Sequence, residues 1–284
     1  MSMRPLDDYI RGQLNNHLEK IEKSLNADGI SIISPILYGL DLCVRDAIEL
    51  IKEKKNALVV IHDTPGGVVE VVERIVDCIR HFYKEVIFII PDRAMSAGTI
   101  FALSGDRILM DYFSCLGPID PQIEKDGKLV PALSYLNQFE RLNKKAEEGK
   151  LTSAEYALLS KLDLGELYQF EQAKELSSEL LIDWLTKYKF KNWAKTRTRQ
   201  IVVTDEMKKA RAEEIAKLLN NTERWHTHGR GIDKQALTDE IKLEIEDYTT
   251  IEGLGKIIRE YSELLKDYMS RGNLISFVHS RGYF

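Results

Sequence analysis

The chain has 284 residues, of which 44% are hydrophobic and 30% charged, so wholesale disorder and a fibrous architecture are excluded. Its formal net charge of -5 gives no broad basic field, which argues against a protein whose whole surface binds nucleic acid. The three cysteines, Cys43, Cys78 and Cys115, are widely spaced and predict a reducing compartment without a disulfide framework.

The N-terminal segment, residues 1–28, is expected to be an amphipathic helix. Its apolar residues recur three or four positions apart, at Leu6, Ile10, Leu14, Leu18, Ile21 and Leu25. Such a stripe suits docking on the chain's own core or on a neighbouring subunit. The segment lacks the continuous apolar stretch of a signal peptide, and no other stretch reaches membrane-spanning length. We therefore expect a soluble, cytoplasmic protein without a membrane span.

From Gly29 onward, short apolar runs alternate with helical periodicity, and an α/β core is expected over residues 29–132. Strands are predicted at 30–33, 57–61, 86–90 and 107–110, and helices at 41–51, 68–79 and 97–104. We expect Asp41 to cap the first of these helices. Strands and helices in alternation are typical of a parallel sheet wrapped by helices.

Residues 133–284 are expected to form a helical region that returns to the core near 225–245. The stretch from Leu133 to Leu219 is charged and helix-favouring, with few glycines and no proline. A turn at 225–231 then leads to a terminal helical stretch over 250–269. The tail after Arg271 is expected to be loosely held.

Two turns follow predicted strands, at the carboxyl ends where open α/β sheets place their ligands. Residues 64–67 read Thr-Pro-Gly-Gly and offer N–H groups unshielded by β-carbons at the amino end of a helix. Residues 94–99 read Ala-Met-Ser-Ala-Gly-Thr and place Ser96 at the start of the next helix. A tetrahedral intermediate needs this pairing of an exposed hydroxyl with main-chain donors. Spacing alone does not establish this function, because Pro-Gly-Gly is a common turn and small residues around a serine also permit close packing of a helix.

The stretch from 59 to 123 resembles the Clp proteolytic subunit, signal peptide peptidase A and, above all, the related serine dehydrogenase proteinase-type family. In these families a Thr-Pro-Gly-Gly or Ser-Pro-Gly-Gly turn supplies the oxyanion hole, and Ala-Met-Ser or Ala-Ala-Ser supplies the nucleophile. Residues 102–111 and 116–122 are similar to the third family in particular. The resemblance implies a Clp/crotonase-like fold in which Ser96 is the nucleophile. It also implies that the amides of Ala97 and of Gly67 or Gly66 hold the oxyanion.

The resemblance leaves the general base open. Clp subunits have a histidine where this chain has Ile119, whereas signal peptide peptidases use a lysine a few dozen residues after the serine. Lys144 and Lys145 stand at that distance, but a lysine accepts a proton only where burial or a nearby cation keeps part of it neutral. His228, in the 225–231 turn, is the alternative base because histidine titrates near neutral pH. The competing interpretations are that both lysines are solvated on a charged helix and that His228 belongs to a purely structural turn.

No cofactor is expected from the sequence. The glycine turn fits neither the phosphate-loop nor the dinucleotide pattern, and His226 with His228 lacks further ligands at zinc-site spacing. The basic run from Lys187 to Arg199 carries interleaved aromatic residues. We interpret it as a solvated helix face and subunit contact, not as a nucleic-acid site. His62, just before the glycine turn, suits strand-end packing or a substrate contact.

Together these features predict a serine endopeptidase-like hydrolase that acts on peptides or unfolded protein segments. The resemblance implies a homo-oligomer in which the long helices build the interfaces or cover the sites. Two alternatives stay open. One is a crotonase-type acyl-CoA enzyme that stabilises a thioester enolate with the same two amides. The other is a non-catalytic oligomeric scaffold that keeps the fold for its interfaces.

Overall fold

The structure, a computed structural model, describes residues 5–120, 122–125, 128–196 and 198–284. Residues 1–4 of the expected N-terminal helix and Pro121 of the 116–122 motif lie outside the described residues. Within the described part of the chain, no helix combines the length and the apolar character needed to cross a membrane.

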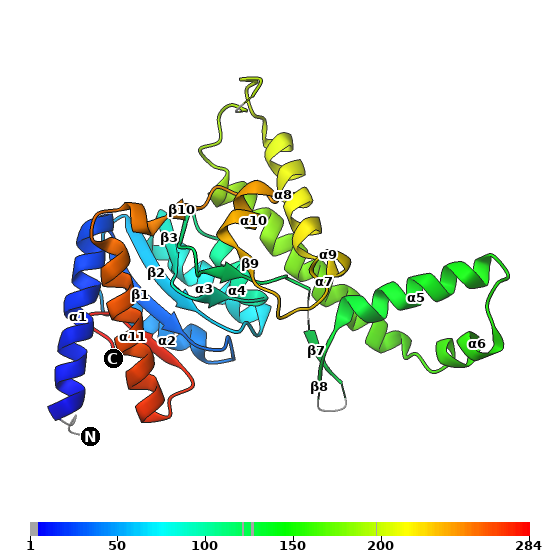
Figure 1. Cartoon of the computed structure of the whole chain (residues 1–284), viewed down its shortest axis with the longest axis horizontal. Helices are drawn as coiled ribbons and strands as arrows, with labels where there is room; N and C mark the ends of the chain where they lie inside the picture. Colours follow the sequence, from blue (N-terminus) through cyan, green and yellow to red (C-terminus); the bar gives the residue numbers. More distant parts are fainter. Residues whose placement is uncertain (1–4, 121, 126–127, 197) are drawn as a thin grey trace.

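The largest sheet among the described residues has six strands, in the order β10-β5-β3-β2-β1-β11 (Figure 1). Its strands are β1 (Asp28–Ile33), β2 (Ala57–Asp63), β3 (Glu85–Ile90), β5 (Arg107–Met110), β10 (Glu246–Asp247) and β11 (Phe277–His279). Neighbouring strands run parallel, except that β11 is antiparallel to β1. The strands are short, β-branched and buried, as central strands of a parallel sheet must be. The predicted α/β class, a mostly parallel sheet wrapped by helices, is confirmed.

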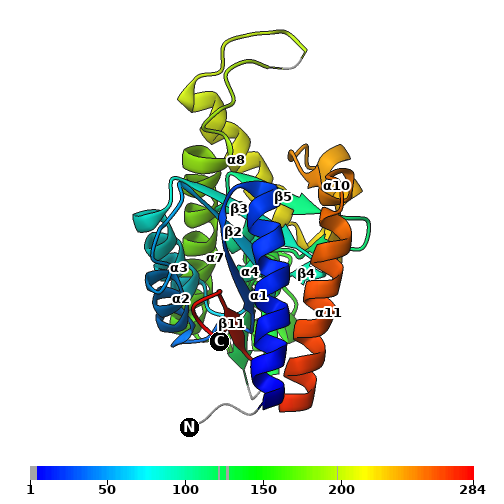
Figure 2. The ribbon, with the colours of Figure 1, turned by 90° about the vertical axis from the view of Figure 1, so that its left-hand side faces the viewer.

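Alternate side chains of the sheet face two separate helical layers. Val59 and Ile61 pack with α1 (Pro5–Leu25) and α11 (Leu254–Gly272), whereas Leu58 and Val60 face the opposite layer. That layer contains α2 (Leu40–Glu49), α3 (Val69–Phe82) and α4 (Ala97–Leu103). Figure 2 shows α1 and α11 side by side on one face of the sheet, with α2 and α3 across from them. Each buried apolar side chain stabilises this arrangement by about 1.5–3 kcal/mol.

A small second sheet lies at the carboxyl ends of β2 and β3. It joins β4 (Arg93–Ala94), β6 (Cys115–Leu116) and β9 (Ile232–Asp233) in the order β4-β6-β9. The first two strands pair parallel and the last two antiparallel. A separate hairpin follows, formed by β7 (Gln122–Lys125) and β8 (Lys128–Pro131). The sequence pattern did not predict this hairpin.

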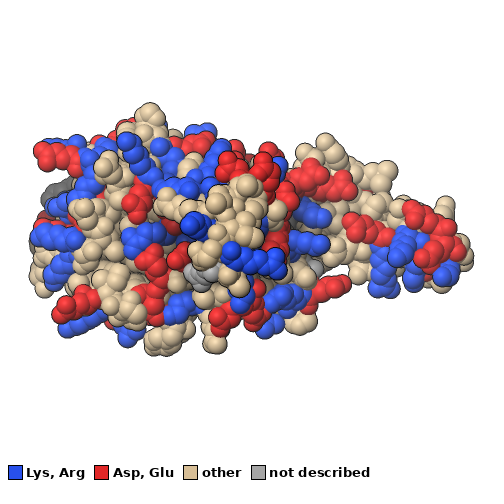
Figure 3. Space-filling view, turned by 90° about the horizontal axis from the view of Figure 1, so that it is seen from above, with Lys and Arg blue, Asp and Glu red and all other residues tan. Residues whose placement is uncertain are grey.

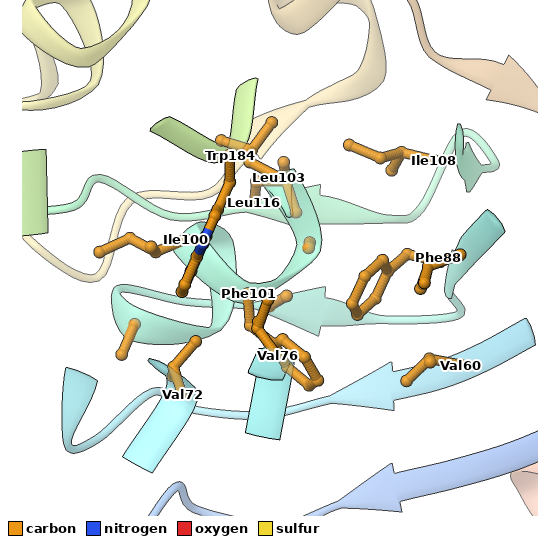
Figure 4. Packing of buried hydrophobic residues seen from close by; sticks show 14 of the residues in the cluster. Val60, Val72, Val76, Phe88, Ile100, Phe101, Leu103, Ile108, Leu116 and Trp184 are labelled. Atoms are coloured by element: carbon orange, nitrogen blue, oxygen red, sulfur yellow. The ribbon is translucent and has the colours of Figure 1, made fainter. Parts of the chain in front are cut away.

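The helical region makes two excursions from the core. Its elements are α5 (Ala132–Glu147), α6 (Ser153–Leu159), α7 (Leu164–Trp184), the π-helix η1 (Leu185–Lys189), α8 (Asp205–Leu219), α9 (Thr222–Trp225), α10 (Lys234–Asp239) and the 3-10 helix η2 (Tyr248–Thr250). In Figure 1, α5 and α6 project far from the sheet and α7 returns to it. Trp184, at the end of α7, packs beside Ile100 and Leu103 of α4 (Figure 4).

The second excursion corrects our interpretation of the basic run. After Phe190 the described residues of the run are no longer helical, and Lys195 forms a β-bridge with Val202, whereas Arg197 of the run lies outside the described residues. The run is therefore a helix face only up to Lys189. β-Branched Ile201, Val202 and Val203 follow the basic residues, and such side chains favour extended backbone over helix. Basic and acidic side chains are interspersed on the face seen in Figure 3.

Two further expectations are wrong. Asp41 does not cap α2, because Gly39 takes the N-cap position with a left-handed φ of 97°, and Asp41 lies in the first turn. The tail after Arg271 is not loosely held, since β11 completes the sheet and His279 is fully buried. The His279 ring contacts the Tyr261 hydroxyl at 2.8 Å and Asn15 Oδ1 at 3.0 Å, so the tail joins α1 to α11.

Candidate active site

The two predicted turns lie against each other. The Thr64 N–H donates to the Arg93 carbonyl at 3.0 Å, and the Met95 N–H donates to the Thr64 carbonyl at 3.1 Å. A β-carbon added to Gly66 would lie 2.7 Å from the Met95 carbonyl oxygen and 2.9 Å from the Ser96 β-carbon. Gly66 also has a φ of +103°, a conformation that other residues rarely adopt. Glycine at this position therefore lets the two backbones meet.

Ser96 occupies a strained position between β4 and α4. Its φ of 54° and ψ of -120° are unusual for a residue with a side chain, and strain of this kind persists where the surroundings enforce it, often at active sites. Ser96 is the N-cap residue of α4, yet its hydroxyl makes no capping hydrogen bond. The side chain is half-buried, and its oxygen has no hydrogen-bond partner among the described residues. The hydroxyl is thus available for a substrate.

Two backbone N–H groups beside Ser96 are likewise available. The Gly66 N–H donates to Thr64 Oγ1 at 3.1 Å, so it is already engaged. Gly67 forms a parallel bridge with Ile36, whose own N–H donates to the Gly66 carbonyl, and this leaves the Gly67 N–H directed away from Ile36. Ala97 begins α4, where N–H groups lack intrahelical partners. Within the described residues, neither the Gly67 nor the Ala97 N–H donates to another protein group.

A buried carboxylate holds His228 at the end of the small sheet where the nucleophile turn also lies. His228 Nδ1 lies 2.9 Å from Asp120 Oδ1, and Asp120 is only 2% exposed. Asp120 follows β6 and His228 precedes β9. These strands pair antiparallel, with Leu116 opposite Ile232, so both residues lie at the same end of the pair. The carboxylate fixes which ring nitrogen carries the proton and leaves Nε2 directed away from the pair.

The small sheet also relates this pair to Ser96. In the parallel β4–β6 pair Ala94 lies beside Leu116, and the Gly117 N–H donates to the Ala94 carbonyl at 3.0 Å. Gly117 packs so closely on Met95 that a β-carbon there would lie 2.7 Å from Met95 Cε. β4 and β6 run parallel and β9 is antiparallel to β6, so the segment after β4, the segment after β6 and the segment before β9 lie at the same end of this sheet. Ser96, Asp120 and His228 therefore lie at one end of the three-stranded sheet.

The two candidate lysines lie elsewhere within this chain. Lys144 and Lys145 occupy the last turn of α5, which Figure 1 shows far from α4. Lys145 Nζ lies 2.5 Å from Glu155 Oε1, and this hydrogen bond helps lower the pKa of Glu155 to about 2. Lys144 lines a groove of about 750 Å³ between α5, α7 and α8. The structure does not bring either lysine to Ser96 of the same chain.

His62 packs in the core beneath the nucleophile helix. It is fully buried, its Nδ1 lies 3.2 Å from the Ile32 carbonyl, and its ring meets Phe101 edge-on at 5.0 Å. Burial lowers the pKa of His62 to about 4, so the ring is neutral at physiological pH. The structure gives it the strand-end packing that we had considered, with no exposed surface for a substrate.

Sequence reasoning missed Asp120 as a partner of His228, although Asp120 was part of the 116–122 motif. It also missed Lys266 of α11, whose Nζ lies 2.6 Å from both Asp63 Oδ2 and Asp92 Oδ2. These partners lie more than 100 residues apart in the sequence, so no local spacing could join them. The antiparallel pairing of β6 with β9 brings the segments of Asp120 and His228 to one end of the small sheet, and strands of two residues leave no pattern in the sequence.

Comparison with known proteins shows the family to which the chain belongs. The family model for the ClpP-like SDH-type serine proteinases matches residues 29–200, more than half of the chain. The chain belongs to this family. The resemblance drawn from the two motifs is thereby confirmed, and family membership supports peptidase activity at the level of the family. The match covers Ser96, both turns and the helical excursion through α7.

Relatives of this chain include two proteins of Methanocaldococcus jannaschii, MJ1495 and MJ0137, both called uncharacterized. They are 32% identical over 170 residues and 34% identical over 168 residues. Each alignment covers 56% of this chain, and 56% and 57% of the respective relative, so it spans little more than half the length of either.

Two solved structures of the 1510-N membrane-bound stomatin-specific protease are also similar. One is a serine-to-alanine mutant, and the other is a lysine-to-alanine mutant in complex with a substrate peptide. They are 24% and 26% identical, cover 42% of this chain and 61% and 57% of their own chains, and give TM-scores of 0.31 and 0.32.

Proposed function

We propose that this chain hydrolyses peptides or unfolded protein segments with Ser96 as its nucleophile. The contact between Gly66 and Ser96 carries the proposal, because it sets an unengaged hydroxyl beside unengaged main-chain donors. The half-buried position of Ser96 favours an extended segment, whose backbone can enter between the two turns, over a folded surface.

In the proposed reaction, the Ser96 hydroxyl attacks the scissile carbonyl carbon. The N–H groups of Gly67 and Ala97 stabilise the oxyanion that develops, since donors fixed in advance need no reorganisation in the transition state. Gly66 supports them differently, because its own N–H is bound to Thr64. Its lack of a side chain keeps the two turns together.

We assign the general base to His228, held by Asp120. Nε2 of the ring takes the Ser96 proton and later gives it to the leaving amine, while Nδ1 shares its proton with the Asp120 carboxylate. Water then hydrolyses the acyl-enzyme by the same route. The 2.9 Å contact, the burial of Asp120 and the common sheet end with Ser96 favour this pair over the lysines of α5.

A fluorophosphonate probe tests the nucleophile, because it bonds covalently to activated serines and expels fluoride. Mass spectrometry should locate the adduct on Ser96 in the native protein and find none in Ser96→Ala. Hydrolysis of an unfolded protein substrate should be lost in the same variant. A native protein that neither labels at Ser96 nor cleaves such a substrate, at any protein concentration, contradicts the proposed activity.

A second set of variants tests the base. His228→Asn and Asp120→Asn should slow labelling by about 10²–10⁴-fold, the range seen when a serine hydrolase loses its base or the partner that orients it. Lys144→Met and Lys145→Met serve as matched controls and should label at the native rate. The reverse pattern, with slow labelling only in a lysine variant, would move the base to α5 of a neighbouring subunit.

We further propose that the protein assembles into a homo-oligomer through its projecting helices. Exposed apolar side chains cluster on α6 and the start of α7, with Tyr156 66%, Leu158 62% and Leu164 72% exposed. Apolar surface on a projecting element is typical of an interface. Light scattering should report an assembly for the native protein and smaller species for Tyr156→Glu with Leu164→Glu. A monomer at every concentration contradicts this part.

A further inference from the structure

Lys266 links the two turns of the candidate active site from the opposite face of the sheet. Its Nζ lies 2.6 Å from the carboxylate of Asp63 and 2.6 Å from that of Asp92. Asp63 ends β2 immediately before the glycine turn, and Asp92 precedes Ser96 by four residues. One ammonium group on α11 therefore bridges the starts of both turns.

Attraction between the Lys266 ammonium group and the two carboxylates stabilises the bridge. Burial raises the pKa of Asp63, and the hydrogen bond from Lys266 lowers it in part. Burial also lowers the pKa of Lys266, but the two carboxylates outweigh that effect and leave the pKa raised. Lys266 therefore stays a cation at neutral pH and cannot act as a base. Without it, two neighbouring carboxylates would repel each other, and the buried Asp63 would lose its counter-ion.

The backbone around both carboxylates transmits the bridge to the site. The Asp92 carbonyl accepts the Cys115 N–H at 2.9 Å, where β6 begins on its way to Asp120. The Asp63 carbonyl accepts the Ser34 N–H at 3.2 Å, in the segment that leads to the bridge with Gly67. A shift of either aspartate would therefore move a strand that carries part of the proposed machinery.

We propose that Lys266 is a positioning residue that fixes the distance between the oxyanion turn and the nucleophile turn. This inference rests on the proposed function of Ser96, Gly67 and Ala97. Lys266 contacts no reacting atom and acts through Asp63 and Asp92. Removing its charge should leave the fold in place while the two turns drift apart.

The test compares the kinetics of fluorophosphonate labelling of Ser96 in Lys266→Met and Lys266→Arg. Lys256→Met is the matched control, because Lys256 lies on the same helix, is highly exposed and pairs only loosely with Glu260 at 3.6 Å. We expect the limiting labelling rate of Lys266→Met to fall by about 10–100-fold, since small misplacement of a reacting group has effects of this size. The half-saturating probe concentration should change little. Lys266→Arg should recover most of the rate, because a guanidinium fork can bind two carboxylates.

Each outcome separates this inference from the proposed function. A native protein without labelling at Ser96 overturns the proposed function and the inference with it. Native labelling with an equal limiting rate in a folded Lys266→Met overturns the inference alone. If Lys266→Met does not fold, Asp92→Asn decides, because it keeps the side-chain shape and removes one charge of the bridge. A folded Asp92→Asn must then label more slowly than Lys256→Met, and an unchanged rate overturns the inference.

Discussion

Gly66 and Ser96 approach so closely that a β-carbon on Gly66 would lie 2.9 Å from the β-carbon of Ser96. Real β-carbons do not come this near to another atom without a shift of the structure. The contact joins two turns that are thirty residues apart in the sequence, and the sequence of each turn alone does not require it. It turns two separate motifs into one site.

We predict that Gly66→Ala separates the turns. Gly39 provides the matched control, because its φ of +97° is close to that of Gly66 and a β-carbon there would meet no atom within 4 Å. Gly39→Ala should lower the free energy of unfolding by about 1–2 kcal/mol from backbone strain alone. Gly66→Ala should cost about 1–3 kcal/mol more from the clash. It should also slow fluorophosphonate labelling of Ser96 at least about tenfold, whereas Gly39→Ala should not. Equal labelling of the two variants would contradict the prediction.

The local parts of the fold were predictable from the sequence. The strands ending at Asp63 and Ile90 are short β-branched runs with a turn after them, and the helices after each turn follow from apolar spacing. The order of these elements sets both turns at the carboxyl edge of one parallel sheet. The sequence alone therefore predicts that Ser96 and the glycine turn lie together.

The rest depends on contacts that leave no local pattern. His228 meets Asp120 beyond the ends of two paired strands that have two residues each, and strands that short carry no period. Lys266 reaches its two carboxylates from the flank of the apolar face of α11, four residues after the buried Ser262 and three before the buried Met269. In a sequence, a lysine beside an apolar helix face is interpreted as solvated whether or not it bridges two loops.

The C-terminal tail shows a related limit. The segment from Phe277 to His279 alternates too briefly to be read as a strand, and its polar flanks suggest a free end. Its place is decided by the open edge of β1, which offers unpaired backbone groups to any nearby strand. The prediction that Asp41 caps α2 failed for a similar reason. The N-cap position follows from the backbone path between β1 and α2, where Gly39 adopts a left-handed conformation without a side-chain cap.

We predict that Trp184→Ala loosens the helix that carries Ser96. Trp184 is 4% exposed and packs between α7 and α4 beside Ile100 and Leu103 (Figure 4). The cavity should lower the free energy of unfolding by about 3–5 kcal/mol, measured by urea denaturation. Tyr168→Ala is the matched control, because Tyr168 lies on the same helix with 59% of its surface exposed, and its loss should cost about 0.5 kcal/mol or less. Similar unfolding midpoints for both variants would show that α7 does not support the core.

We predict that acid destabilises the fold before most carboxylates titrate. Burial lowers the pKa of both His62 and His279 to about 4, against an unfolded value of 6.5. Between these values the unfolded chain binds more protons, so the stabilisation is complete above pH 6.5 and decreases as the pH falls toward 4. At pH 5 each histidine should lower the free energy of unfolding by about 2 kcal/mol relative to its value above pH 6.5. Urea denaturation from pH 7 to pH 5 measures the loss.

Single histidine variants show which residue causes the acid sensitivity. His279→Gln removes one of the two buried rings and should reduce the loss between pH 7 and pH 5 by about half. His81→Gln is the control, because His81 is exposed on α3 and should leave the loss unchanged. An identical pH dependence in native protein and His279→Gln would mean that His279 does not stay neutral in the folded state.

Removal of residues 277–284 should destabilise the protein and expose β1 to association. Ile32 pairs with Val278 and Ser31 with His279, so the truncated chain would present an unpaired central-type strand at the sheet edge. Urea denaturation should report a loss of several kcal/mol, since burial of each large apolar side chain contributes about 1.5–3 kcal/mol, and light scattering should report aggregation. Val278→Ala keeps the backbone pairing and separates the two effects, with a smaller loss of about 1–2 kcal/mol and no aggregation. A truncated protein that stays dispersed and unfolds at the native midpoint would restore the interpretation of a loose tail.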